Sequence, residues 1–232
     1  MLTAKKKISS RDAVPKSTSA DFFYNAQDWF KANTKLIGGA ALAIAAVIIV
    51  GYLYMSGVEA DDLAANRELR KVQELYQQQQ YRLAIGGDAS QGVMGLEEIT
   101  DKFSGTPTAE VAMIYLGNSY LYAGDLDKAL QVFEDASPDT DMLRAAALAG
   151  EAAVYEAKGE YGEAAPLFEK AARIFENDLL STERYLAAGR AYGKAGDKER
   201  AAEMLDMTKD SKQQQAQQTA DRLRAEFGLD IE

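Results

Sequence analysis

A long run of apolar residues is the clearest pattern in the first quarter of the chain. No residue between Lys35 and Glu59 is charged, and residues 36–55 read LIGGAALAIAAVIIVGYLYM. A helix crosses the ~30 Å hydrocarbon core of a bilayer with about 20 apolar residues, whereas a soluble helix normally keeps one polar face. A cleavable signal peptide has a shorter apolar region followed by a small-residue cleavage site, which YLYMSGVEADD lacks. The pattern therefore predicts a transmembrane helix over residues 36–56, and it favours this over a buried core helix or a signal peptide.

A second pattern recurs three times later in the chain. Its core is Tyr-x-x-x-Gly-(Asp/Glu)-x-x-x-Ala-x-x-x-(Phe/Leu), with the tyrosines at Tyr120, Tyr155 and Tyr192. The distance in sequence from one of these tyrosines to the next is close to the ~34-residue period of stacked helix–turn–helix units. The glycine of the pattern is expected to end the first helix of each pair, because glycine adopts the left-handed conformation at least cost. A single unit cannot bury its apolar face alone, so the pattern predicts a stack of helix pairs.

The two patterns predict an all-α chain with a single N-terminal transmembrane helix and an α-solenoid of helix pairs. We expect a flexible basic tail over residues 1–20, a juxtamembrane amphipathic segment over 21–35, the span over 36–56 and a repeat domain over 57–232. The clear repeats cover about 110–143, 145–178 and 182–210, and a capping helix covers about 211–228. A less regular unit is expected before Pro107, with its first helix over residues 64–84.

The segment before the span has two interpretations. Phe22, Ala26, Trp29 and Phe30 fall at helical spacing on one side, which is typical of a helix lying in the membrane interface. Alternatively, the two aromatic residues nearest the span begin the aromatic belt of the spanning helix. Both interpretations place the segment at the membrane.

The distribution of charge predicts the orientation of the span. Seven lysines and arginines precede it against three aspartates, while Glu59, Asp61 and Asp62 follow it. Because basic residues are retained on the cytoplasmic side, we expect a cytoplasmic N-terminus and a repeat domain on the opposite side. The reversed topology stays open, since this bias is a tendency. The whole chain has a net charge of −10, and an acidic domain without clustered Lys and Arg is unsuited to nucleic acid.

The composition also limits the chemistry. The chain has no histidine and no cysteine, so it cannot form a Ser-His-Asp triad, a thiolate nucleophile or the usual zinc and haem ligand sets. Acidic pairs occur throughout a charged surface and are typical of solvated faces. We therefore expect no enzymatic activity, no catalytic residue, no cofactor, no metal and no small-molecule substrate.

These repeats resemble the tetratricopeptide repeat family over about residues 110–208. The resemblance implies a concave face formed by the first helix of each unit, which would bind polypeptide partners. By the family's inward positions, this face would include eight residues: Ile114, Asn118, Leu121, Tyr122, Glu156, Leu186, Arg190 and Lys194. Family members that clamp a peptide carboxylate use a set of Lys, Arg and Asn, of which this chain offers Asn118, Arg190 and Lys194 only.

The layout of basic arm, span and repeats resembles the YfgM-type ancillary proteins of the bacterial Sec translocon. Most of the similarity to members of this size in Bacteroidetes and green sulfur bacteria is carried by YRLAIGGDASQGVMGLEEITDKFSGTPTAEVAMIYLGNSYLYAGDLDKAL. The resemblance implies a single-pass protein of the bacterial inner membrane with a periplasmic domain. Its partners would be Sec translocon components, periplasmic chaperones or exported chains. The alternative is a structural tether or self-associating scaffold of another envelope complex.

Overall fold

The computed structural model describes residues 27, 29–175, 178–209 and 211–229, and it divides into two units, 1–55 and 56–232. Helix α2 (Thr34–Gln77) begins in the first unit and ends in the second. Residues 1–20, Phe22 and Ala26 lie outside the described residues, so the expected tail and half of the expected amphipathic face are not described. Trp29 and Phe30 are exposed and pack edge to face, with ring centroids 5.4 Å apart.

The two ends of α2 have opposite environments. None of its most apolar stretch is buried, and α2 is the one helix in the described part of the chain that is long and apolar enough to cross a membrane. Further along, Ala65, Leu69, Val72 and Leu75 recur at helical spacing and are buried in the core of the second unit. Asp62 accepts a hydrogen bond of 2.8 Å from the backbone N–H of Thr108 and so caps the start of α5.

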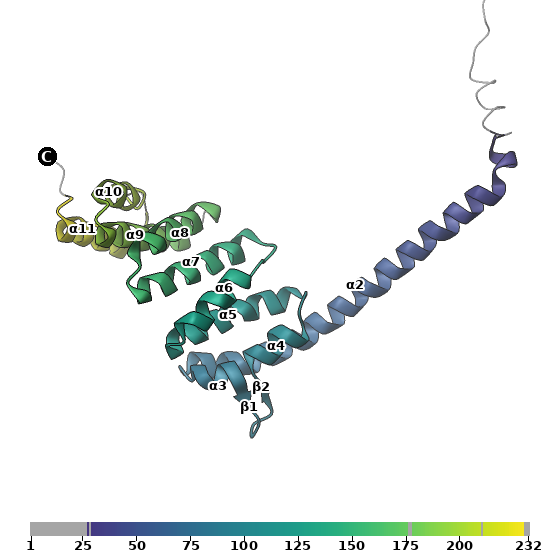
Figure 1. Cartoon of the computed structure of the whole chain (residues 1–232), viewed down its shortest axis with the longest axis horizontal. Coiled ribbons are helices and arrows are strands. Elements are labelled where there is room, and N and C mark those ends of the chain that lie inside the picture. Colours follow the sequence, from purple (N-terminus) through teal and green to yellow (C-terminus); the bar gives the residue numbers. More distant parts are fainter. Residues whose placement is uncertain (1–26, 28, 176–177, 210, 230–232) are drawn as a thin grey trace, which may run out of the picture. The chain divides into compact units, whose positions relative to one another are not determined.

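The second unit is a succession of helices (Figure 1). The later part contains α5 (Pro107–Ala123), α6 (Leu126–Asp135), α7 (Asp141–Lys158), α8 (Tyr161–Ile174), α9 (Asp178–Ala195), α10 (Lys198–Asp206) and α11 (Gln214–Phe227). Each helix from α5 to α10 packs against the next, and α11 packs against α9. The prediction of a predominantly helical chain is confirmed.

The long helices α5, α7 and α9 end in the same way. In each, a glycine with φ near +80° follows the last helical residue, and two backbone hydrogen bonds close a Schellman motif. In α5, for example, Gly124 donates to Leu121 and Asp125 donates to the carbonyl of Tyr120. The tyrosine of the sequence pattern is thus the residue whose carbonyl accepts the bond that spans more residues of the chain. The other two glycines of the set are Gly159 and Gly196.

The helix expected over residues 64–84 is interrupted, which corrects that expectation. Helix α2 ends in the same Schellman motif, with Gln79 at φ +59° in place of glycine and Gln80 donating to Leu75. A short helix α3 (Tyr81–Gly86) follows, then strands β1 (Gly87–Asp88) and β2 (Val93–Met94), then α4 (Leu96–Lys102). The strands pair antiparallel, with Gly87 opposite Met94.

This hairpin lies between the short helices α3 and α4, which together take the place of the second helix of a regular helix pair. A Cβ on Gly95, just before α4, would lie 2.4 Å from the backbone of Gly86 at the end of α3. Only glycine allows this approach, because real Cβ contacts are never so short. The first unit of the stack therefore consists of the end of α2 followed by α3 and α4, with the hairpin inserted between the last two.

Large side chains of the second helices fit against glycines of the first helices. Phe133 of α6 lies between Gly117 of α5 and Gly150 of α7, where added Cβ atoms would come within 2.6 and 2.3 Å of its ring. Leu205 of α10 is placed in the same way over Gly189 of α9. These contacts need the glycines because the helix backbones approach closely there.

Two tyrosines of the pattern also join neighbouring units by hydrogen bonds. Tyr120 of α5 donates its hydroxyl to Glu97 of α4, and Tyr192 of α9 donates to Glu169 of α8 over 2.8 Å. Glu169 also accepts from Arg200 at 2.9 Å, so it connects α8, α9 and α10. Its exposed fraction is only 9%, and these charge-assisted bonds offset the cost of burying the carboxylate.

Candidate protein-binding surface

The eight candidate residues lie on the first helices of their units. Ile114, Asn118, Leu121 and Tyr122 are on α5, Glu156 is on α7, and Leu186, Arg190 and Lys194 are on α9. Three of them have a structural role: Ile114 and Leu121 pack against the core around α5, and Leu186 packs against the core formed by α10 and α11. Asn118 is half-buried and Tyr122 is 57% exposed.

Glu156 and Arg190 bind each other. Nε and Nη2 of Arg190 each donate to a separate carboxylate oxygen of Glu156 at 2.8 Å. The bidentate pair connects α7 directly to α9, and the hydrogen bond to Glu156 raises the pKa of Arg190 despite partial burial. The two opposite charges are therefore engaged within the domain, and this part of the face carries little net charge.

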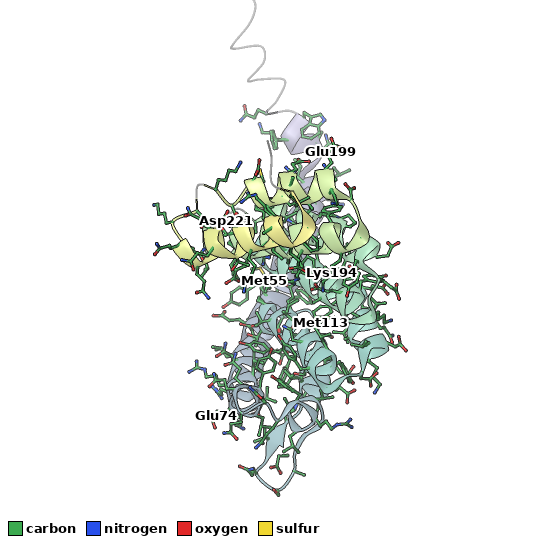
Figure 2. All side chains as sticks on the ribbon, turned by 90° about the vertical axis from the view of Figure 1, so that its left-hand side faces the viewer. Met55, Glu74, Met113, Lys194, Glu199 and Asp221 are labelled. Atoms are coloured by element: carbon green, nitrogen blue, oxygen red, sulfur yellow. The ribbon has the colours of Figure 1, made fainter. Side chains whose placement is uncertain are left out.

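Lys194 is exposed near the end of α9, where Figure 2 labels it. Its ammonium group lies 4.7 Å from the ring centroid of Tyr161 at the start of α8. Such a cation–π contact at an exposed site holds a lysine only weakly, at about 0.5–1 kcal/mol. Lys194 can therefore exchange this contact for a partner's carboxylate at low cost.

Beside α5 the structure brings together four tyrosines, of which the sequence interpretation identified only Tyr122. Tyr76 of α2 lies at the centre, with ring centroids 5.0 Å from Tyr115 and 5.5 Å from Tyr81. Tyr81 lies 5.0 Å from Tyr122. The sequence placed Tyr76 and Tyr81 in one continuous helix, so only the break at Gln79 allows both rings to face α5.

An open hollow of about 480 Å³ adjoins this tyrosine cluster. Its lining combines aromatic rings, two amides, a guanidinium and an exposed leucine: Gln79, Gln80, Tyr81, Arg82, Leu83, Tyr122 and Ala123. Tyrosine supplies a large contact area at little entropic cost, and amides adapt their hydrogen bonds to varied partners. The hollow is thus chemically suited to polypeptide. Among the described residues, no group of three or more acidic side chains is placed to hold a metal ion.

The tyrosine cluster should be visible in an alkaline titration. Burial, and then the neighbouring Tyr122, Tyr81 and Tyr115, raise the pKa of Tyr76 from 10.0 to about 12. Between these pH values the unfolded chain loses this proton while the folded protein keeps it, so stability falls as pH rises from 10 to 12 and is unaffected below. Ultraviolet absorbance should show late-ionising tyrosines, fewer in Tyr76→Phe. If Tyr76→Phe instead removes a tyrosine ionising near pH 10, the packing of the cluster is wrong.

Comparison with known families identifies the chain. A family model described as a tetratricopeptide repeat-like domain matches residues 27–177, and the chain belongs to this family. The matched region includes the apolar part of α2 and extends through α8, whereas α9 to α11 lie beyond it. No curated protein and no solved structure matches the chain. A tetratricopeptide repeat-like domain indicates protein–protein interaction, and such domains are typically non-enzymatic modules.

Proposed function

We propose that this protein is a non-enzymatic, membrane-anchored adaptor whose repeat domain binds polypeptide partners. One observation carries the proposal. No residue of the apolar stretch of α2 is buried, while the end of the same helix contributes Ala65, Leu69, Val72 and Leu75 to the core of the repeat domain. Some 20 apolar residues in water are unfavourable, whereas in a bilayer they stabilise insertion. The family match also includes this stretch, which supports its being an integral part of the protein.

The helix pairs form an α-solenoid in this proposal, and the first helices form its binding face. The repeated helix ends, the glycine contacts and the link between Glu156 and Arg190 support a regular stack. The face would consist of the exposed members of the candidate set, above all Asn118, Tyr122 and Lys194, extended by the tyrosine cluster. Ile114, Leu121, Leu186, Glu156 and Arg190 would shape that face from beneath or within it.

The adaptor would be a single-pass protein of the bacterial inner membrane, spanning it over residues 36–56. The excess of basic residues before the span supports a cytoplasmic N-terminus and a periplasmic repeat domain over 57–232. Resemblance to YfgM-type proteins supports a role beside the Sec translocon, with translocon components, chaperones or exported chains as partners. Confinement to the same membrane raises the effective concentration of a weak binder near such a partner.

Site-specific crosslinking in membranes tests this proposal. A photoreactive residue at Tyr122 should capture a partner, and one at Glu199, exposed on α10 and labelled in Figure 2, should capture far less. Mass spectrometry identifies the captured protein, and a translocon component or exported chain is the expected result. Protease added to spheroplasts should digest the repeat domain. Protection from protease would overturn the periplasmic location, and capture of this chain alone would favour a self-associating scaffold.

A further inference from the structure

A second hollow on the described part of the repeat domain lies away from the candidate face. It measures about 760 Å³ and is bounded by the end of α6, the loop 136–140, α7 and α8. Arg144, Leu148 and Glu151 of α7 line it, at positions that fall on one side of a helix. Glu156 is five residues beyond Glu151, which turns it roughly 140° around the helix axis. The hollow, called the α6–α8 cleft below, therefore opens on a different side of α7.

The α6–α8 cleft has an apolar floor and a charged rim. Phe133 and Ala147 are buried at its base, and Leu148 and Ile174 add half-buried apolar surface. The rim carries four carboxylates and two cations: Glu134, Asp139, Asp141, Glu151, Arg144 and Lys170. Arg144 is already engaged in a salt bridge with Asp141. Three carboxylates thus face a single remaining cation, Lys170.

Glu134 differs in its hydrogen bonding from the glutamates of the neighbouring units. It follows the left-handed residue Gly124 by the same interval as Glu169 follows Gly159. Glu169 accepts the hydroxyl of Tyr192, as Glu97 of the first unit accepts that of Tyr120. Glu134 makes no corresponding bond to Tyr155 within the described chain, and its side chain lines the cleft instead. The middle unit therefore lacks the tyrosine–glutamate hydrogen bond of its neighbours at the place where the cleft opens.

The charge in the cleft is incompletely compensated. Burial, followed by the nearby Glu134, raises the pKa of Glu151, and Lys170 lowers it by less than these two raise it. Glu134 and Glu151 form neither a hydrogen bond nor an ion pair with any side chain that the structure describes. A further positive charge between these two carboxylates would relieve their repulsion. Lys170 compensates this charge only in part, so a cation of a binding partner would add a favourable contact.

We propose that the α6–α8 cleft binds a segment of a partner polypeptide in which Lys or Arg stands beside an apolar residue. The cationic head would lie between Glu134 and Glu151, and the methylene stem and apolar neighbour would cover Phe133, Leu148 and Ile174. Lys and Arg combine an aliphatic stem with a charged end in this way. The volume of the cleft lies within the ~300–1,000 Å³ range of binding pockets and fits several side chains. It is too large for a bare metal ion. The inference rests on the proposed function and names the chemistry of its partner.

A peptide-binding measurement on the full chain in detergent tests the inference. The probe is a short fluorescent peptide of alternating leucine and lysine, compared with one of alternating leucine and glutamate. Fluorescence anisotropy should show binding of the basic peptide only. The double variant Glu134→Gln with Glu151→Gln should weaken that binding about tenfold, because both contacts to the cation lose their charge. The double variant Glu163→Gln with Glu199→Gln removes the same charge from exposed positions outside the cleft and should bind as the unaltered protein does.

The outcomes separate this inference from the proposed function. Equal loss of peptide binding in both double variants would mean that binding follows the overall charge of the domain, and it would contradict the assignment of binding to the cleft. If Tyr122→Ala abolishes peptide binding and the double variant of Glu134 and Glu151 does not, the cleft is not the binding site, while the proposed function stands. If the protein self-associates and the cleft variants abolish this, the ligand of the cleft is a second copy of this chain and not a peptide segment of another protein. If the protein binds Ca²⁺ and no peptide, the ligand is a cation. Circular dichroism melting of each variant confirms that the fold is retained.

Discussion

Replacing Gly150 with leucine is expected to destabilise the repeat domain by about 3 kcal/mol or more, at the upper end of the cost of overpacking a core. A Cβ at Gly150 would lie 2.3 Å from two ring atoms of Phe133. The ring cannot retreat, because Gly117 lies on its other side at a spacing that leaves no room for a Cβ either. Urea unfolding of the full chain in detergent, followed by circular dichroism at the helical band, measures the loss.

A matched substitution controls for the effect of removing a glycine from a helix. Gly162 lies in the first turn of α8, where an added Cβ meets no atom within 4 Å. Gly162→Ala should therefore stabilise the domain by about 0.5–1 kcal/mol through the entropy of the unfolded chain. In the Gly150→Leu background, Phe133→Ala should cost much less than it does alone, because the two side chains compete for one space. Unchanged unfolding of Gly150→Leu would count against the packing of α6 between α5 and α7.

Placing two arginines in the apolar stretch should release the protein from the membrane. Ala45 and Ile48 are exposed on α2 and lie within the expected span. Arginine at the centre of a spanning helix costs about 3 kcal/mol relative to the apolar residue it replaces, so the two changes together exceed the favourable insertion energy of the stretch. Ala45→Arg with Ile48→Arg should appear in the soluble or degraded fraction after alkaline carbonate extraction.

The control for this experiment keeps the stretch apolar. Ala45→Leu with Ile48→Leu changes the same positions and should remain in the pellet as the unaltered protein does. Extraction of the unaltered protein by carbonate would remove the anchor from the proposed function. The repeat fold would be unaffected by that result, since the core residues of the second unit lie from Ala65 onward.

The sequence predicted the regular part of this fold well. Gly124, Gly159 and Gly196 mark helix ends because the left-handed conformation is a local property of glycine, and all three have φ near +80°. Gly117 and Gly189 stand at the same place in their repeats, and both lie where two helices approach closely. Such features depend on residues close in sequence, which a repeat pattern records directly.

The less regular part escaped prediction for a physical reason. Gln79 adopts the left-handed conformation that glycine has at the other helix ends, so the break between α2 and α3 could not be recognised from a glycine in the sequence. The eight candidate residues lie on α5, α7 and α9, and their contacts with other side chains were not foreseen. Arg190 binds Glu156 from 34 residues away, and Tyr76 meets Tyr115 across two helices. Pairings of this kind depend on tertiary placement and on no single spacing.

The position of Phe133 has a consequence for how the domain unfolds. Its ring belongs to α6, yet the space it fills is made by α5 of its own helix pair and α7 of the next. Neither pair can melt without exposing that ring, so the junction couples neighbours as in a one-dimensional chain of interacting units. A fragment ending between α6 and α7 would leave the aromatic side chain uncovered on one side. The helix pairs α5–α6 and α7–α8 are therefore expected to unfold together, and a stable fragment of the domain should keep this junction intact.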